Sequence, residues 1–152
     1  APARILPDTC RELPLEDEML LFLGEFSEKA EEVCPRGTLR RVLDRASDMG
    51  FEVFSALEYE FFMFEETPDS IREKKFRDLK PMTPDWFGYS MIRNSTHADL
   101  YHQILGMSEQ MDFPIEGLHT ETGPGVLEAA ITVDTALNSA DKGALFKTFM
   151  KV

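Results

Sequence analysis

Two carboxylates interrupt an otherwise apolar and aromatic stretch, Ser55-Ala56-Leu57-Glu58-Tyr59-Glu60-Phe61-Phe62-Met63-Phe64. Its aromatic content and that of the residues just before it predict a β-strand over residues 51–64. Because alternate side chains of a strand share a face, Glu58 and Glu60 point the same way. The aromatic cluster Phe61-Phe62-Phe64 is interpreted as core. An unpaired carboxylate beside buried surface is costly, so this pair requires an explanation.

A second pair of carboxylates, Glu121 and Glu128, flanks the turn Gly123-Pro124-Gly125 between strands predicted at residues 113–122 and 126–133. Pro124 cannot adopt a positive φ, which disfavours the tightest hairpin turns and predicts a slightly wider loop. A hairpin symmetric about Pro124-Gly125 would place the two carboxylates directly opposite each other. Like charges in that position destabilise a sheet, and a cation between them would remove the penalty.

Four carboxylates on two strand-like segments therefore suggest a shared cation. Hard divalent ions such as Mg²⁺ and Mn²⁺ prefer oxygen ligands of this kind. The pattern predicts a metal-dependent phosphoryl-transfer site, of which this chain carries part. The alternative is that all four are solvent-exposed residues of amphipathic strands, and each pair taken alone would favour that interpretation.

The rest of the chain alternates between extended and helical segments. Residues 3–6 are predicted to form a short strand, and residues 14–32 fit either a helix or a strand that enters a loop. Pro35 suits the first turn of a helix that Gly50 ends. Residues 65–94 hold prolines, charges and little periodicity, and are interpreted as one long loop.

Two more helices are predicted in the second half of the chain. Thr96, with Asp99 three residues later, resembles a capping signal at the start of one. Asn138 or Ser139 is predicted to cap the last helix, which continues to Val152. Together the elements predict an α+β fold, with a mostly antiparallel sheet and packed helices.

Composition limits the function. The chain has 152 residues, enough for one domain, and a formal net charge of −12, which argues against a nucleic-acid surface and an anionic membrane surface. No apolar run approaches the roughly 20 residues needed to span a bilayer. Cys10 and Cys34 are too few for a disulfide framework and are interpreted as reduced thiols of a cytoplasmic protein. Both ends of the chain are abrupt, so we expect it to be a piece of a longer protein.

Two motifs resemble those of the glutamine synthetase family. The stretch 55–64 is similar to its first metal-binding strand, with the pattern G-x-E-x-E-F-F-L-F. The stretch 114–128 resembles its second motif, G-x-x-x-x-x-H-H-E-x-x-P-G-Q-x-E, in the same order and with a helix between the two. The similarity extends from about Pro35 to the end of the chain. It implies that residues 1–152 are the N-terminal portion of a glutamine-synthetase-type catalytic domain.

The resemblance implies a role for each of the four carboxylates. Glu60, Glu121 and Glu128 match the three ligands of one metal ion in the family, which is Mg²⁺ or Mn²⁺. Glu58 matches a ligand of a second metal ion. The other ligands of that second ion, a His and a Glu, belong to family motifs downstream of this chain.

Further residues match the substrate sites of the family. Tyr89 resembles the tyrosine that lines the ammonium pocket, and Glu116 resembles a residue that contacts the nucleotide. His119 keeps one of the two histidines beside the metal. Thr120 replaces the second histidine, and Val126 replaces a frequent glutamine. These departures leave the metal ligands intact and put the identity of the amine substrate in doubt.

The implied activity is that of an ATP-dependent ligase that phosphorylates the side-chain carboxylate of glutamate and then joins it to ammonia or an amine. Divalent ions would place positive charge against the phosphate oxygens. Substrates would be glutamate, ATP and ammonia or an amine, and the full-length protein is expected to be a ringed homo-oligomer. The isolated piece is expected to be inactive.

Three alternatives remain open from the sequence. A γ-glutamyl-polyamine or γ-glutamyl-alkylamine ligase would use the same metals with a larger amine pocket. A non-catalytic structural relative would keep the fold, although the four intact carboxylates argue against it. A standalone acidic binding module is the third alternative.

Overall fold

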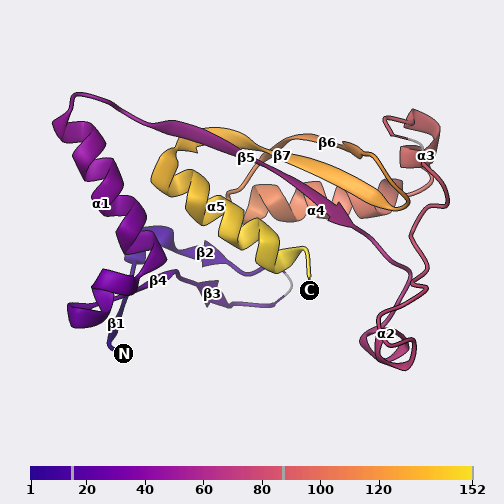
Figure 1. Cartoon of the computed structure of the whole chain (residues 1–152), viewed down its shortest axis with the longest axis horizontal. Coiled ribbons are helices and arrows are strands. Elements are labelled where there is room, and N and C mark those ends of the chain that lie inside the picture. Colours follow the sequence, from indigo (N-terminus) through magenta and orange to yellow (C-terminus); the bar gives the residue numbers. More distant parts are fainter. Residues whose placement is uncertain (15, 87, 152) are drawn as a thin grey trace. The chain divides into compact units, whose positions relative to one another are not determined.

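The computed structural model describes residues 1–14, 16–86 and 88–151. Val152, predicted to lie in the last helix, and Phe87, next to the predicted substrate residue Tyr89, fall outside the described residues. The elements, labelled in Figure 1, are β1 (Ala3–Ile5), η1 (Pro7–Thr9), β2 (Arg11–Glu12), β3 (Leu20–Leu21), β4 (Gly24–Phe26), η2 (Glu28–Val33), α1 (Pro35–Asp48), β5 (Phe54–Phe62), α2 (Pro68–Glu73), α3 (Met91–Ser95), α4 (Ala98–Gln110), β6 (Ile115–Thr120), β7 (Val126–Thr135) and α5 (Ala136–Phe149).

The chain divides into two compact units that are described separately. Unit 1 comprises Ala1–Leu57, Ile104–Ile115 and Ile131–Val152, and unit 2 comprises Glu58–Gln103 and Glu116–Ala130. The described helices include none that is both long enough and apolar enough to cross a bilayer.

Unit 1 has an apolar core around its helices. Phe113 and Phe146 are fully buried and meet edge to face, with ring centroids 6.2 Å apart. Helix α1 begins at Pro35, as predicted, and the chain leaves it at Gly50, whose φ of +84° is the left-handed conformation that a helix C-terminus favours in glycine. The strand predicted at residues 3–6 is confirmed as β1, which pairs with β4, while β2 pairs with β3. Residues 14 and 16–32, whose structure the sequence left open, contain β3, β4 and most of η2.

A buried ion-pair cluster also belongs to unit 1. Glu25 on β4 is 1% exposed, and its carboxylate accepts hydrogen bonds from Arg4, Arg36 and Arg40. Arg36 also donates two bonds of 2.9 Å to Asp141 on α5. Burial opposes ionisation of Glu25, but the hydrogen bonds and charges of the arginines outweigh it and hold its pKa at about 2.

A three-stranded sheet in the order β5-β7-β6 carries the predicted site residues. Hydrogen bonds from Met63 N–H to the Gly125 carbonyl and from Ala136 N–H to the Val53 carbonyl show that β5 and β7 are antiparallel. Exposed and half-buried residues alternate along β5. This confirms the predicted strand and the mixed helix and antiparallel-sheet fold. The assignment of Phe62 and Phe64 to the core is wrong, because Phe62 is 60% exposed on the face that also carries the two glutamates and Phe64 is 38% exposed.

Three predictions about the positions of helices require correction. The predicted long loop at residues 65–94 contains two short helices, α2 and α3, stabilised by local caps at Thr67 and Ser90. Thr96 lies at the C-terminal end of α3, where its hydroxyl donates to the Arg93 carbonyl, so it does not start the next helix. Helix α5 begins at Ala136 directly after β7, before the predicted caps at residues 138–139. Its entry is set by the preceding strand, which overrides the local capping preference.

Candidate metal and substrate site

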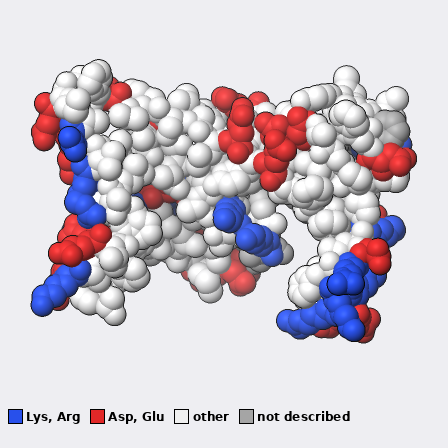
Figure 2. All heavy atoms as spheres, viewed as in Figure 1, with Lys and Arg blue, Asp and Glu red and all other residues white. Residues whose placement is uncertain are grey.

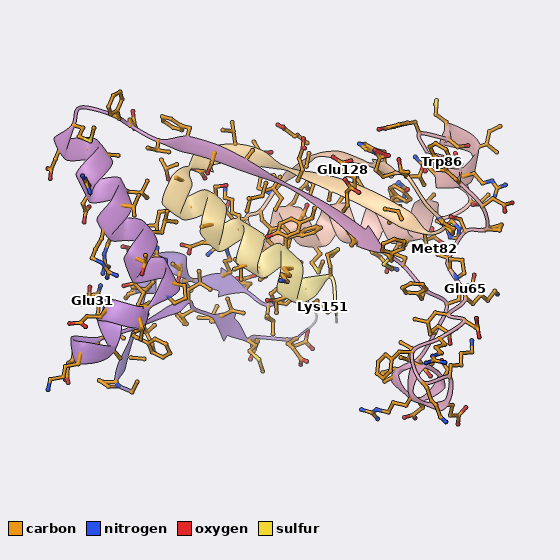
Figure 3. All side chains as sticks on the ribbon, viewed as in Figure 1. Glu31, Glu65, Met82, Trp86, Glu128 and Lys151 are labelled. Carbon is orange, nitrogen blue, oxygen red and sulfur yellow. The ribbon has the colours of Figure 1, made fainter. Side chains whose placement is uncertain are left out.

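All seven predicted site residues lie in unit 2. They are Glu58, Glu60, Tyr89, Glu116, His119, Glu121 and Glu128. Acidic side chains gather where strands β5, β6 and β7 lie (Figure 2), and Figure 3 labels Glu128 there.

Strand β5 presents its two glutamates on one face. Glu58 and Glu60 are exposed, while Tyr59 between them is half-buried on the opposite face. The hydrogen bond from Met63 to Gly125 is 2.8 Å long, and three residues further along each strand lie Glu60 and Glu128. Cross-strand neighbours in an antiparallel pair have side chains in contact range. The sheet therefore brings a carboxylate of the first motif beside one of the second.

The turn between β6 and β7 is wider than a two-residue hairpin loop, as predicted. Gly123 and Gly125 have φ of +132° and +69°, which leaves Pro124 between them at an ordinary negative φ. The Glu121 N–H donates to the Val126 carbonyl at 3.0 Å, which pairs those two residues.

This pairing corrects the predicted register. Counting from Glu121 opposite Val126 places His119, not Glu121, opposite Glu128. The same register explains why a Cβ built on Gly117 would lie 3.6 Å from the Ala130 Cβ. The hairpin is centred one residue earlier than expected because Gly125, not Pro124, takes the left-handed conformation at the end of the turn. Glu121 and Glu128 still share a face, as diagonal neighbours.

Tyr89 contacts this carboxylate face directly. Its hydroxyl donates to Glu121 Oε1 at 2.7 Å, and its N–H donates to the Thr120 carbonyl at 2.9 Å. Its ring lies against His119, with centroids 5.1 Å apart. Its φ is +62°, an uncommon conformation for a tyrosine that the two hydrogen bonds maintain.

The electrostatics of Tyr89 show which carboxylates converge on it. The hydrogen bond to Glu121 and the charge of that carboxylate raise the pKa of the tyrosine most. The negative charges of Glu128 and Glu60 raise this pKa further. All three carboxylates therefore act on one hydroxyl group, and these are the three that the family resemblance assigns to one metal ion.

Of the two remaining predicted residues on β6, Glu116 stands apart from this group and His119 lies against it. Glu116 is exposed and lies three residues before His119 on β6, so strand alternation places it on the other face of the sheet. His119 is half-buried, with Nδ1 3.3 Å from the Thr120 carbonyl. The structure thus brings His119 to the carboxylates and leaves Glu116 away from them.

The carboxylate face lacks compensating protein charge. Across residues 1–14, 16–86 and 88–151, no ion pair involves Glu58, Glu60, Glu121 or Glu128. In the same residues, no three His, Cys, Asp or Glu side chains converge closely enough to form a ready-made metal cage. The donors are all carboxylate oxygens, which suit Mg²⁺ or Mn²⁺. The arrangement fits a cation site whose side chains draw together around the ion.

Sequence reasoning missed Thr83, whose hydroxyl accepts a hydrogen bond of 3.1 Å from the Gly125 N–H. No local motif marks a contact between residues 42 positions apart. The only signal is the pair of prolines, Pro81 and Pro84, which bias the segment towards an extended conformation.

Comparisons with known proteins identify the family of the chain. A family model described as "Glutamine synthetase, catalytic domain" matches residues 32–152. The chain is 39% identical over 142 residues to Type-1 glutamine synthetase 2 of Dictyostelium discoideum. This alignment covers 91% of this chain and 27% of that protein. It is 28% identical over 119 residues to the glutamate–isopropylamine ligase of a Pseudomonas species, covering 78% of this chain and 26% of that protein.

A solved structure shows the same fold. The GmaS/ADP complex superposes with a TM-score of 0.77 at 20% identity, over 96% of this chain and 33% of that one. The chain thus spans about a quarter to a third of the length of these relatives. The match to residues 32–152 agrees with the extent of the resemblance in the sequence. The chain belongs to the glutamine synthetase family and corresponds to part of its catalytic domain.

Proposed function

We propose that the protein containing this chain is an ATP-dependent ligase that joins ammonia or an amine to the side-chain carboxylate of glutamate through a γ-glutamyl phosphate. The observation that carries the proposal is the face formed by Glu58 and Glu60 on β5, Glu128 on β7 and Glu121 just after β6, for which the described residues show no ion pair. Like charges on neighbouring strands repel one another, and a bound cation would compensate that repulsion. Membership of the family supplies the reaction class.

The carboxylates would hold two divalent ions. Glu60, Glu121 and Glu128 would bind one Mg²⁺ or Mn²⁺, and Glu58 would contribute to a second, whose other ligands lie outside this chain. When bound, such ions supply positive charge to the transferring phosphoryl group. The strands fix the spacing of these carboxylates before the ions arrive, which limits the reorganisation that binding requires.

Tyr89 would work on the amine side of the site. Its hydroxyl holds Glu121 by a hydrogen bond, so it orients a metal ligand while its ring borders His119. Glu116 is the nucleotide contact that the family pattern implies. Its place on the other face of β6 means that it would reach a nucleotide only from that side of the sheet.

A larger amine than ammonia is the second candidate substrate. Thr120 and Val126, which replace a histidine and a glutamine common in the family, are both buried. Val126 shares the face of Glu128 on β7, whereas strand alternation turns Thr120 to the opposite face of the sheet. A relative that matches 78% of this chain is named as an isopropylamine ligase. These two observations favour testing alkylamines alongside ammonia.

The wider assignment rests on the same family. We place residues 1–152 in the N-terminal portion of a catalytic domain within a longer, cytoplasmic, ringed homo-oligomer. In that setting, downstream segments would complete the glutamate and nucleotide sites. The chain alone would bind metal weakly and lack ligase activity.

The test is Mn²⁺ binding and glutamate-dependent ATP turnover by the full-length protein. The double variant Glu60→Gln and Glu128→Gln should lose both. The matched control, Glu73→Gln and Glu109→Gln, makes the same change in charge at exposed positions elsewhere and should keep both. Equal Mn²⁺ binding by the two double variants would refute the carboxylate site. Comparing ammonia with isopropylamine as the second substrate then separates the two ligase candidates.

A further inference from the structure

A four-residue segment of unit 2, residues 80–83, here named the strap, pairs with residues 63–65, which follow strand β5 directly. The Glu65 N–H donates to the Lys80 carbonyl, and the Met82 N–H donates to the Met63 carbonyl, each at 2.9 Å. An antiparallel bridge links Phe64 to Pro81 between these bonds. Figure 3 labels Met82 beside the end of β5. The strap thus continues the backbone pairing of the strand that carries Glu58 and Glu60.

The strap also holds the turn between β6 and β7. The Thr83 hydroxyl accepts a hydrogen bond of 3.1 Å from the Gly125 N–H, while the Gly125 carbonyl accepts one of 2.8 Å from Met63. Both polar groups of the Gly125 backbone are therefore hydrogen-bonded, the N–H to the strap and the carbonyl to Met63, the residue after β5.

The packing at Gly125 is close. A Cβ added there would lie 2.6 Å from the Met63 carbonyl oxygen, 3.1 Å from the Met82 nitrogen and 3.2 Å from the Pro81 Cβ. An added side chain at Gly125 would therefore meet backbone on two sides, so the turn and the strap pack closely together. Thr83 provides the side-chain hydrogen bond to the Gly125 backbone in this contact.

The position of the Gly125 backbone also influences the positions of both carboxylates of the second motif. It follows Glu121 by four residues and precedes Glu128 by three. A displacement of its backbone would alter the separation of these two carboxylates from each other and from Glu60 on β5. Groups that orient metal ligands in this way commonly affect metal affinity by 10- to 100-fold.

We propose that Thr83 is a positioning residue for the metal-binding carboxylates: its hydroxyl fixes the Gly125 turn so that Glu121 and Glu128 meet Glu60 at the spacing that a divalent ion requires. This inference rests on the proposed function. Thr83 touches neither the metal nor the substrates, and it acts through the backbone of the turn.

The experiment compares Thr83→Val, which keeps the shape but removes the acceptor, with Thr83→Ser, which keeps a hydroxyl. Thr96→Val is the control, because Thr96 is an exposed residue of the same unit whose hydroxyl bonds only to its own helix. Mn²⁺ affinity of the full-length protein is measured by water-proton relaxation, and the Mn²⁺ dependence of ATP turnover is measured in parallel. We expect roughly 10-fold weaker Mn²⁺ binding for Thr83→Val. Thr83→Ser and the control should bind like the wild type.

A positioning role also predicts that kcat of Thr83→Val recovers at saturating Mn²⁺, which a merely structural defect would not allow. Mn²⁺ affinity of Thr83→Val equal to that of the wild type, or Thr83→Ser as impaired as Thr83→Val, would overturn the inference and leave the proposed function intact. A wild-type protein that neither binds Mn²⁺ nor turns over ATP would overturn both. Should Thr83→Val fail to fold, Thr83→Ala, which adds no bulk, is judged by the same outcomes.

Discussion

Each of the two units contains a group of carboxylates, and the two groups differ in how their negative charge is compensated. In unit 1, Glu25 is fully buried and accepts hydrogen bonds from three arginines. In unit 2, the carboxylates on β5, β6 and β7 share a half-exposed face, and the hydrogen bonds described to them come from the hydroxyls of Tyr89 and Thr122. A buried charge that is already paired holds elements together, whereas a gathered but unpaired set is suited to an added cation.

This difference separates carboxylates that stabilise the fold through ion pairs from carboxylates that are suited to bind a cation. Glu66 shows that unit 2 also builds structural ion pairs: Ser70 and Lys74 donate to its carboxylate, as does the Lys80 N–H, and they hold its pKa at about 2. Figure 2 shows charges of both signs around α2, where these residues lie. The carboxylates of the sheet differ from Glu66, whose buried side chain is compensated within the same unit.

The largest expected effect breaks the compensated cluster. Glu25→Gln leaves three arginines around a neutral group and should reduce the free energy of unfolding by about 3–5 kcal/mol. Glu31→Gln removes a half-exposed partner of Arg40 in the same cluster and should cost less than about 1 kcal/mol. Urea denaturation measures both. Similar losses for the two variants would mean that burial does not distinguish Glu25.

Measuring the free energy of unfolding as a function of pH tests the role of the Glu25 charge further. The pKa of Glu25 is lowered from 4.5 to about 2 in the folded state, so its stabilisation is complete above pH 4.5 and is lost as pH falls towards 2. The stability difference between wild type and Glu25→Gln should therefore shrink across that window. Using the difference cancels the contribution of Glu66, which titrates in the same range. A gap that stays constant between pH 5 and pH 2 contradicts the assignment.

Adding metal should convert the uncompensated face into a compensated one. At about 100 times its dissociation constant, Mn²⁺ should stabilise the full-length protein by about 2.7 kcal/mol. Glu128→Gln should abolish this gain, yet without metal it should be neutral or slightly stabilising, because it removes a like charge. Thermal unfolding with and without Mn²⁺ measures both effects. A clear loss of metal-free stability in Glu128→Gln would instead indicate a structural role like that of Glu25.

The smallest expected effect concerns the turn that carries the second motif. Gly125→Ala forces a Cβ against backbone at a positive φ and should destabilise the protein by about 1–3 kcal/mol. Gly106→Ala on α4 is the control, since nothing lies within 4 Å of its added Cβ, and it should stabilise by about 0.5–1 kcal/mol. Denaturation midpoints of the two variants should move in opposite directions. Movement in the same direction would show that the Gly125 contact is not constraining.

Local chemistry explains what was predicted correctly. Pro35 and Gly50 bracket α1, and the alternation in β5 places Glu58 and Glu60 on one face. The prediction failed where a distant contact or a competing local signal was decisive. Thr96 resembled an N-cap but ends α3, and Phe62 resembled a core residue but lies on the carboxylate face.

The sequence by itself indicated the family through the resemblance of two motifs. It also determined the strands that carry the carboxylates and the glycines of the turn, because periodicity and backbone preferences act over a few residues. Only the tertiary structure decided that His119 faces Glu128, that Thr83 holds Gly125 and that Glu25 is buried under three arginines. These are contacts between residues distant in sequence or set by register. The free energy of these contacts depends on which strands and helices pack together. The order of residues alone does not specify that packing.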